Sequence, residues 1–220
     1  MQQLIDWLDL AGAVVTADAM HCQRETAEKI IAKDADYVLM VKGNQETLEA
    51  AVQEAMIQAF ETDDPKLRQC QAKERNRSRG ETRQVAVFPV PKNSAVFARW
   101  AGAKTIGSIC RTRELDRRVE AAQEFFISSL PCTVRKFTQH LRSHWSIENS
   151  QHHLLDVTFT EDASRIRKGT GPEISSVFRR LALNILQQDT SIPDNVRGKR
   201  KRCGWSEHTL ELLIAGFSRV

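Results

Sequence analysis

Apolar residues in the first sixty positions occur either in short unbroken runs or with a helical period. The unbroken runs are 13–17 (AVVTA) and 37–41 (YVLMV), and each fits a strand that is buried on both faces of a sheet. Helical patterns over residues 3–10, 23–33 and 45–60 precede, separate and follow these runs. Strand, helix and strand with short connections predict a βαβ unit with two parallel strands and a right-handed crossover.

Residues 61–132 carry a pattern that is typical of antiparallel strands. Three strands are expected over 84–90, 103–113 and 124–130, the last two joined by a charged turn around 116–118. The first part, residues 61–83, is charged and has no apolar period, so we expect an exposed connection there. The region is therefore predicted to be an antiparallel β element inserted between the βαβ unit and later helices.

The C-terminal third is predicted to be helical. One long helix with a charged tail is expected over 133–167, and a second helix over 172–188 with Pro172 in its first turn. The apolar side of this second helix should consist of Val177, Leu181, Leu183, Ile185 and Leu186. A linker over 189–195, a basic cluster at 197–202 (RGKRKR) and a terminal helix over 205–217 complete the chain. The predicted segments are thus 1–60, 61–132, 133–188 and 189–220.

One carboxylate interrupts the apolar stripe of the long helix. At about 100° per residue, the stripe consists of Val134, Phe137, Leu141, Trp145 and Leu155. Glu148 falls in the middle of it, where an uncompensated charge would be strongly destabilising. Glu148 is therefore a candidate site residue whose charge needs a cation or strong hydrogen-bond donors.

A second carboxylate, Asp18, directly follows the first predicted strand. Open α/β sheets bind their ligands at the carboxyl ends of parallel strands. The alternative is that Asp18 caps the helix that begins near Cys22. Carboxylates are hard oxygen ligands, and pairs of Mg²⁺ ions held by them perform phosphoryl transfer. Asp18 and Glu148 could form such a site.

Two other kinds of site are open from the residues alone. Four side chains follow one another at four-residue intervals, but they drift around the helix and have no HExxH order, so they could not all bind one zinc ion. These residues are His140, His144, Glu148 and His152. A nucleophilic cysteine, Cys22 or Cys132 with a histidine, is the other alternative, although neither lies in a recognisable motif.

Composition narrows the class of protein. The chain of 220 residues is 41% hydrophobic and carries a formal net charge of +4, which permits nucleic-acid binding without requiring it. Its five cysteines include no CxxC pair, and no signal peptide or long apolar run is present, so we expect a soluble cytoplasmic protein without a membrane partner. The basic cluster is a candidate DNA contact through Lys199, Arg200, Lys201 and Arg202, or a solvated tail.

Three separated motifs point to one family. VVTADAMHCQ, ADYVLMVKGNQ and HWSIENSQHHLLDVTFTEDASRIR, with RGETR and FFISSL between them, resemble the H-repeat-associated insertion-sequence transposases. The likeness covers nearly the whole chain in the same order. These are DDE transposases with a ribonuclease-H-like core. The resemblance implies an α/β fold: a partial ribonuclease-H-like catalytic core with an inserted antiparallel β element and C-terminal helices.

The resemblance also implies roles for individual residues. Asp18 matches the second catalytic acid and Glu148 the final one, and both would bind Mg²⁺ or Mn²⁺. Lys42 and Asn44 would contact DNA near the cleaved phosphate, while His144 and Asn149 would position Glu148 or touch DNA. Asp162 and Arg165 fall in a motif of the group, and Arg165 is a further candidate DNA contact.

The chain departs from the family pattern at the first catalytic Asp. That residue belongs to an upstream IDGK-like strand, and Asp6 and Asp9 lie in a helical pattern instead. The Tyr, Arg and Lys that surround the final Glu in the wider DDE group are here Leu141, His144 and Leu155.

We therefore expect a truncated DDE transposase that is catalytically defective by itself. The intact enzyme would catalyse Mg²⁺-dependent DNA strand cleavage and transfer during DNA transposition. Its partners would be the DNA ends of the insertion element, and itself or a full-length transposase, in the bacterial cytoplasm and on the nucleoid when bound to DNA. One alternative is a non-catalytic DNA-binding remnant that modulates a full-length transposase. Another is a decayed reading frame that does not fold stably.

Overall fold

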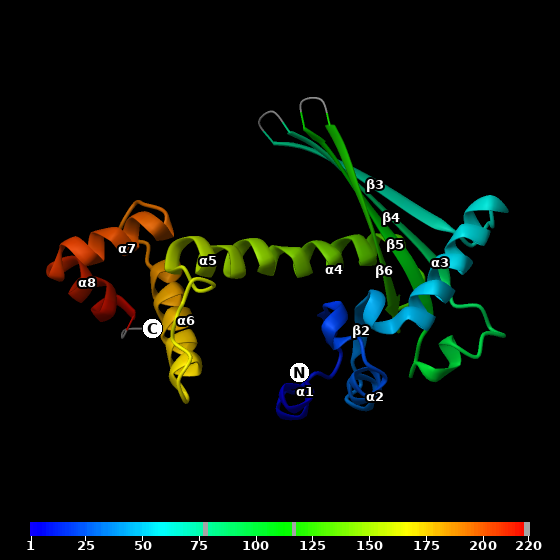
Figure 1. Ribbon diagram of the computed structural model, residues 1–220, viewed down its shortest axis with the longest axis horizontal. Helices are drawn as coiled ribbons and strands as arrows, with labels where there is room; N and C mark the ends of the chain where they lie inside the picture. The colour runs from blue at the N-terminus through cyan, green and yellow to red at the C-terminus, as the bar shows by residue number, and fades with distance from the viewer. Residues whose placement is uncertain (77–78, 116–117, 218–220) are drawn as a thin grey trace. The chain divides into compact units, whose positions relative to one another are not determined.

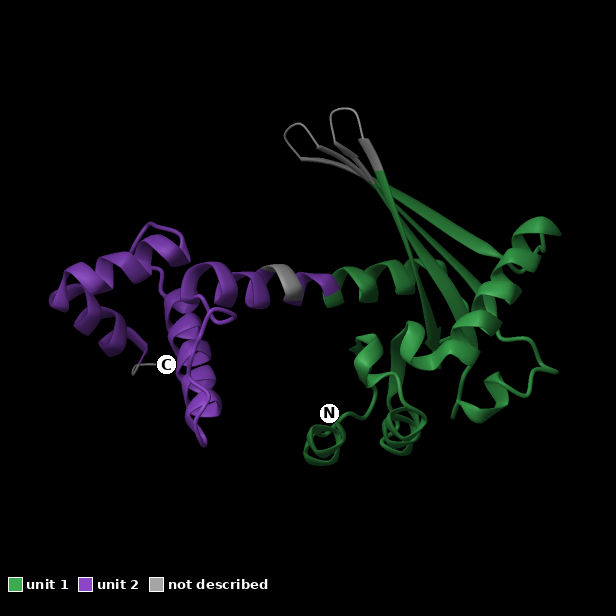
Figure 2. Cartoon of the chain, in the orientation of Figure 1, with its two compact units in different colours: residues 1–144 green, residues 145–220 purple. Residues whose placement is uncertain are grey.

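The computed structural model describes residues 1–76, 79–115 and 118–217, without the side chains of 74–81, 113–119, 148 and 149. The chain forms two compact units, Met1–His144 and Trp145–Val220, coloured separately in Figure 2. Each unit is described by itself below. In the described part of the chain, no helix combines the length and the apolar character needed to cross a membrane.

The predicted βαβ unit is confirmed, but the expected burial on both faces is wrong for its first strand, which lies at the edge of the sheet and is only partly buried at Val14, Val15 and Thr16. The elements of the unit in chain order are α1 (Gln2–Trp7), β1 (Val14–Ala17), α2 (Arg24–Ala32) and β2 (Asp36–Val41), followed by α3 (Glu46–Glu61). β1 and β2 pair in parallel, with Val14 opposite Asp36 and Ala17 opposite Leu39. Short 3-10 turns, Ala19–His21 and Gly43–Gln45, follow the two strands. Both strands therefore end at the same edge of the sheet.

Four more strands extend the same sheet. They are β3 (Arg68–Asn76), β4 (Arg79–Pro89), β5 (Thr105–Leu115) and β6 (Arg118–Ser128). The six-stranded sheet has the order β1-β2-β6-β5-β4-β3, and β2 runs antiparallel to β6. Figure 1 shows the long strands β3 to β6 lying side by side. The β element expected between the βαβ unit and the helices thus continues the sheet of the βαβ unit.

The exposed connection expected over 61–83 is wrong. α3 continues to Glu61, and β3 with the first part of β4 occupies most of the remainder. The strands pair throughout, from Arg68 opposite Val87 to Asn76 opposite Arg79. Because polar residues occupy nearly every position of this segment, no alternation of hydrophobicity marks it as a strand. Of the charged turn expected around 116–118, residues 116 and 117 lie outside the described part of the chain.

Helices cover both faces of the sheet. On one face α3 contacts β5 and β6, and its Val52 and Met56 belong to the same buried cluster as Ile127. On the other face, Phe137 of α4 (Val134–Ile147) packs against Phe126 of β6, with ring centroids 5.2 Å apart. β2 lies between these two layers, which explains why its residues from Tyr37 to Val41 are all buried.

Gly107 permits a close approach inside the sheet. It lies on β5 directly opposite Phe126 of β6. A Cβ atom at this position would overlap the Phe126 ring and the carbonyl oxygen of Ala86. The glycine therefore makes room for the aromatic ring on which α4 packs.

The long helix expected over 133–167 is not regular. After α4, residues Glu148–His152 form a π-helical segment, and α5 (His153–Phe159) follows. The helix ends at Phe159, because Thr160 adopts a left-handed conformation with φ 51°. A π turn spaces its hydrogen bonds five residues apart, so a period of 100° cannot be extrapolated through it. The apolar stripe is thus established only within α4, where Phe137 and Leu141 are buried.

The second unit contains α6 (Gly171–Gln188), α7 (Val196–Trp205) and α8 (Glu207–Phe217), which contact one another, while α6 and α7 also contact α5. The apolar side expected for α6 is partly wrong. Leu183 and Leu186 are buried, whereas Val177 is 65% and Leu181 42% exposed. These two pairs lie on different sides of a helix with 100° per residue, so one packing face cannot bury both.

Candidate functional site

Three side chains meet at the end of β1. Thr16 and Asp18 are two residues apart, which directs both toward the same face of the sheet. His144 reaches them from α4, with Nδ1 3.2 Å from Thr16 Oγ1 and Nε2 3.0 Å from Asp18 Oδ1. The side chain of His144 is 13% exposed and that of Asp18 is 64% exposed. The structure thus brings Asp18 and His144 together and presents the carboxylate to solvent.

The capping alternative for Asp18 does not hold. α2 begins at Arg24, with Gln23 as its N-cap residue. Asp18 precedes the 3-10 turn Ala19–His21, and its side chain makes no capping hydrogen bond to it. The carboxylate of Asp18 is therefore not used to start a helix.

Residues after β2 hold the backbone that follows Asp18. Asn44 Nδ2 donates to the carbonyl oxygen of Ala19 at 2.6 Å, and Gln45 Nε2 donates to that of Cys22 at 3.1 Å. Parallel strands place these two segments at the same edge of the sheet. The expected DNA contact Asn44 thus has its amide group engaged in shaping the Asp18 loop.

Lys42 lies at the same edge and has a carboxylate partner. Its Nζ is 2.9 Å from Glu124 Oε1 on β6. An ion pair at a largely exposed position contributes little stability, but it lowers the net positive charge that Lys42 offers to DNA. Sequence reasoning did not identify Glu124, because only the pairing of β2 with β6 brings it near.

A surface pocket of about 350 Å³ adjoins the motif after β2. Gly43, Asn44 and Gln45 line one part of it, and Arg24 and Arg99 supply exposed guanidinium groups. Glu46 also lines the pocket, so the lining carries a small excess of positive charge beside the Asp18 loop. Neither arginine was singled out from the sequence.

Thiol chemistry is not supported. The five cysteines are free, and burial raises the pKa of Cys22 to about 12. Burial also raises the pKa of Cys132, although Arg68 partly opposes this rise. Because the thiolate is the nucleophile, a raised pKa makes both residues poor nucleophiles.

Glu148 and Asn149 have side chains outside the described part of the structure. Their backbone begins the π-helical segment, and such segments often occur at functional sites. Among the side chains that are described, no three His, Cys, Asp or Glu residues are arranged to bind a metal ion. His144, one member of the zinc alternative, contacts Thr16 and Asp18 instead.

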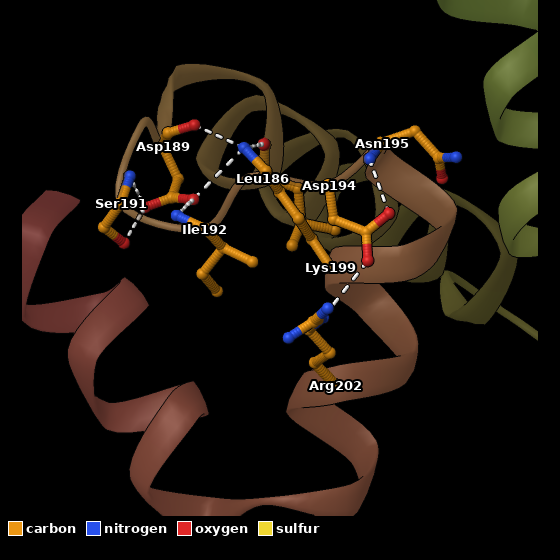
Figure 3. A network of polar contacts seen from close by, with 8 residues as sticks. All are labelled: Leu186, Asp189, Ser191, Ile192, Asp194, Asn195, Lys199 and Arg202. Carbon is orange, nitrogen blue, oxygen red and sulfur yellow. Dashed lines mark hydrogen bonds and ion pairs between the residues drawn. The ribbon is translucent and has the colours of Figure 1, made fainter.

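The basic cluster of the second unit is mostly engaged in structure. Lys199 is 6% exposed, and its Nζ donates to the carbonyl oxygens of Leu186, at 3.1 Å, and Asp189. It also lies 3.1 Å from Asp189 Oδ2 (Figure 3). Arg202 Nε pairs with Asp194 Oδ2 at 3.1 Å. Lys199 and Arg202 thus hold the connection between α6 and α7.

Arg200 is also partly occupied. It donates to the carbonyl oxygen of Thr158, and its guanidinium lies 5.2 Å from the ring centroid of Phe159. Lys201 and Arg165 are exposed, Lys201 on α7 and Arg165 in the segment after α5. Arg200 and Arg202 are exposed as well, but each has a partner within the second unit.

The pKa of Asp189 is determined by the groups that contact its carboxylate. Burial raises the pKa of its carboxyl, but hydrogen bonds from the Ser191 side chain, Lys199 and the backbone amides of Ser191 and Ile192 outweigh burial. The pKa of Asp189 is lowered to about 2. This carboxylate therefore belongs to the polar network of Figure 3, which gives the loop 189–195 its shape.

Asp18 suits a divalent cation by the chemistry of its donor atoms. A carboxylate is a hard oxygen ligand of the kind that Mg²⁺ and Mn²⁺ prefer. Its exposure leaves space for an ion with several bound waters. Asp18 supplies one ligand, and further ligands must come from other groups.

Comparisons with known proteins found a matching family and several similar curated proteins. The family described as "Transposase DDE domain" matches residues 1–185. In Escherichia coli strain K12, "Putative protein YbfL" and "H repeat-associated putative transposase YhhI" are each 33% identical over 97% of this chain. "Putative transposase YncI" of strain O157:H7 is 35% identical over 99% of it. The chain spans 57% to 58% of the length of these curated relatives. No solved structure matches it significantly.

Proposed function

Because the chain belongs to the family of transposase DDE domains, we propose that it carries two carboxylates of a metal site that cleaves and transfers DNA strands. These are Asp18 and Glu148. The observation that carries the proposal is an exposed Asp18 at the carboxyl end of β1, with its Oδ1 held by His144. Ligands of α/β sheets bind at such strand ends.

The proposal includes a ribonuclease-H-like core. The parallel pair β1 and β2 with α2 between them would form part of that core, together with β6, which runs antiparallel to β2. Residues 61–132 would correspond to the β-rich insertion, and α4 to the helix that leads to the final catalytic Glu.

Magnesium or manganese would be the cofactor. Such ions activate the attacking oxygen and stabilise the leaving oxygen during in-line displacement at phosphorus. The role of the protein is to present carboxylate oxygens at fixed positions. Asn44 and Gln45 contribute by fixing the backbone that follows Asp18.

Glu148 enters the proposal through its place in the family motif. In HWSIENSQHHLLDVTFTEDASRIR it matches the final catalytic Glu. The π-helical segment that begins at Glu148 is a second reason to propose a functional role, because regular packing alone does not require it.

DNA would be the substrate, in the form of insertion-element ends. The basic groups we propose for phosphate contacts are Lys42, Arg24 and Arg99 near Asp18, and Arg165 and Lys201 in the second unit. Lys199 is left out because it is buried. Arg202 pairs with Asp194 as Lys42 pairs with Glu124, but Lys42 is kept because it lies at the sheet edge beside Asp18. This reduced set also weakens the alternative of a DNA-binding remnant that relies on the basic cluster. A second copy of the chain or a full-length transposase would be a protein partner.

The chain of 220 residues should not transfer DNA strands by itself. The resemblance implies three catalytic carboxylates, and the sequence offers a match for two of them, Asp18 and Glu148. A strand-transfer assay with Mg²⁺ and the DNA that flanks the coding sequence checks this. Transfer that the Glu148→Gln variant loses would contradict the defect while supporting the role of Glu148.

Iron-mediated cleavage of the polypeptide tests the metal site directly. Fe²⁺ can replace Mg²⁺ or Mn²⁺ at oxygen ligands, and with ascorbate and peroxide it cuts the backbone nearby. We expect cuts close to Asp18 that excess Mn²⁺ suppresses and that Asp18→Asn abolishes. An Asp162→Asn variant is the matched control and should keep the cuts. Cuts that are unaffected by Asp18→Asn would refute the proposed function.

A further inference from the structure

The imidazole of His144 is held between two groups of one strand. Nδ1 lies 3.2 Å from Thr16 Oγ1 and Nε2 lies 3.0 Å from Asp18 Oδ1. With 13% of its side chain exposed and both ring nitrogens engaged, His144 has little surface left for a DNA phosphate. Its contacts point to Asp18 as the group on which it acts.

The two contacts determine which atoms donate in the neutral ring. A carboxylate only accepts hydrogen bonds, so the ring proton must be on Nε2. Nδ1 is then an acceptor, and the Thr16 hydroxyl donates to it. Donation therefore runs from Thr16 through the ring to Asp18 Oδ1.

The other carboxylate oxygen of Asp18 is left available. Within the described residues Oδ2 takes no hydrogen bond, and the side chain is 64% exposed. With Oδ1 fixed by His144, rotation of the carboxylate is restricted and Oδ2 keeps one direction. A metal ion then meets an oxygen that is already oriented.

We infer that His144 is a positioning residue that fixes Asp18 for a divalent cation, and that Thr16 fixes the ring of His144. The inference rests on the proposed function, because it assumes that Asp18 binds the cation. Groups that hydrogen-bond to metal ligands orient them, and removing such a group weakens metal binding by about 10-fold to 100-fold.

A purely structural role for His144 makes a different prediction. α4 is already attached to the sheet by Phe137, which packs on Phe126. If His144 served only to hold α4 in place, its replacement would lower stability without a specific effect on metal affinity. The two roles therefore separate when affinity and stability are measured on the same variants.

Mn²⁺ titration of the full chain, followed by electron paramagnetic resonance of the free ion, makes this measurement. We expect His144→Leu to weaken Mn²⁺ binding by about 10-fold to 100-fold, and Thr16→Val by a smaller factor. His144→Gln should recover much of the affinity, because its amide can donate to Asp18. His140→Leu, one turn earlier on α4, is the matched control and should bind like the unaltered chain.

The outcomes separate the inference from the proposed function. If Asp18→Asn does not change Mn²⁺ affinity, or the unaltered chain does not bind Mn²⁺, the proposed function is wrong and the inference falls with it. If Asp18→Asn weakens binding but His144→Leu and Thr16→Val do not, the inference alone is overturned.

Nitrogen-15 spectra of the histidine rings give a second readout that needs no metal. The signals of His144 are those that disappear in His144→Gln. We expect the Nε2–H form in the unaltered chain and a loss of its predominance in Thr16→Val. A predominant Nδ1–H form would overturn the inference, even if His144→Leu failed to fold.

Discussion

Lys199 and Asp189 form an almost fully buried ion pair in the second unit. Removing one partner of such a pair leaves an uncompensated charge in the interior. We expect Lys199→Met to destabilise the second unit by about 3 kcal/mol. Hydrogen–deuterium exchange of the backbone amides of α7 measures this locally. Lys201→Met, on the exposed side of the same helix, should change protection little, and equal effects of both variants would contradict the account.

The same pair gives the second unit a defined acid sensitivity. The pKa of Asp189 is about 2 in the folded chain, below its ordinary value of 3.8. A carboxyl with a depressed folded pKa stabilises the fold above its ordinary pKa, and this contribution is lost as the pH falls toward the folded value. The protection of the α7 backbone amides from hydrogen–deuterium exchange should therefore decline between pH 4 and about 2. Asp189→Asn should show a smaller decline in that range. An unchanged decline would show that protonation of Asp189 does not cause the acid sensitivity.

Gly107 illustrates a constraint on the packing of the sheet. An added methyl group would overlap Phe126 and the backbone of Ala86. We expect Gly107→Ala to destabilise the first unit by about 1–3 kcal/mol, as overpacked cores do. Urea unfolding checks this, with Gly43→Ala as the control, because a Cβ there has nothing within 4 Å. Equal stability of the two variants would contradict this, because it would mean that Phe126 and the backbone of Ala86 shift to accommodate the added methyl group.

At the scale of elements, α4 connects the core to the site. Phe137 packs on Phe126, and His144, two turns later, reaches Asp18. We expect Phe137→Ala to cost about 3–5 kcal/mol and to loosen the contact between His144 and Asp18. Nitrogen-15 spectra of the histidine rings measure this loosening, as a loss of the predominance of the Nε2–H form of His144. Gln139→Ala, on the exposed side of α4, should leave the ring unchanged.

The elements that the sequence predicts well are those whose pattern reflects local burial. β2 is an apolar run because it is buried on both faces, whereas β1, at the edge of the sheet, is only partly buried at its first three positions. α2 and α3 carry a helical period. β3 has no such pattern, because its polar residues satisfy strand pairing without entering a core. The π-helical segment after Ile147 likewise leaves no mark in hydrophobicity, since it changes hydrogen bonding and not composition.

At the scale of the whole molecule, the site could be predicted only in part. Asp18 was identifiable because a strand end is a local feature, and Thr16 was detectable as a polar residue two positions before it in an apolar run. Glu124 and the contact of His144 arise from pairing and packing between distant segments. No local pattern encodes these. Lys199 was expected to face DNA because charge runs are usually exposed, but the carboxylate and carbonyl groups around it compensate its burial.

The central claim is that Asp18 binds a divalent cation for chemistry on DNA. The most direct measurement is the affinity of the chain for a DNA duplex with a free 3′-hydroxyl end, by fluorescence anisotropy, with Mn²⁺ or with chelator. The account predicts that Mn²⁺ strengthens binding and that Asp18→Asn removes this gain but keeps the salt-sensitive part that the basic groups provide. Binding that does not respond to Mn²⁺, or a gain that survives Asp18→Asn, would contradict it.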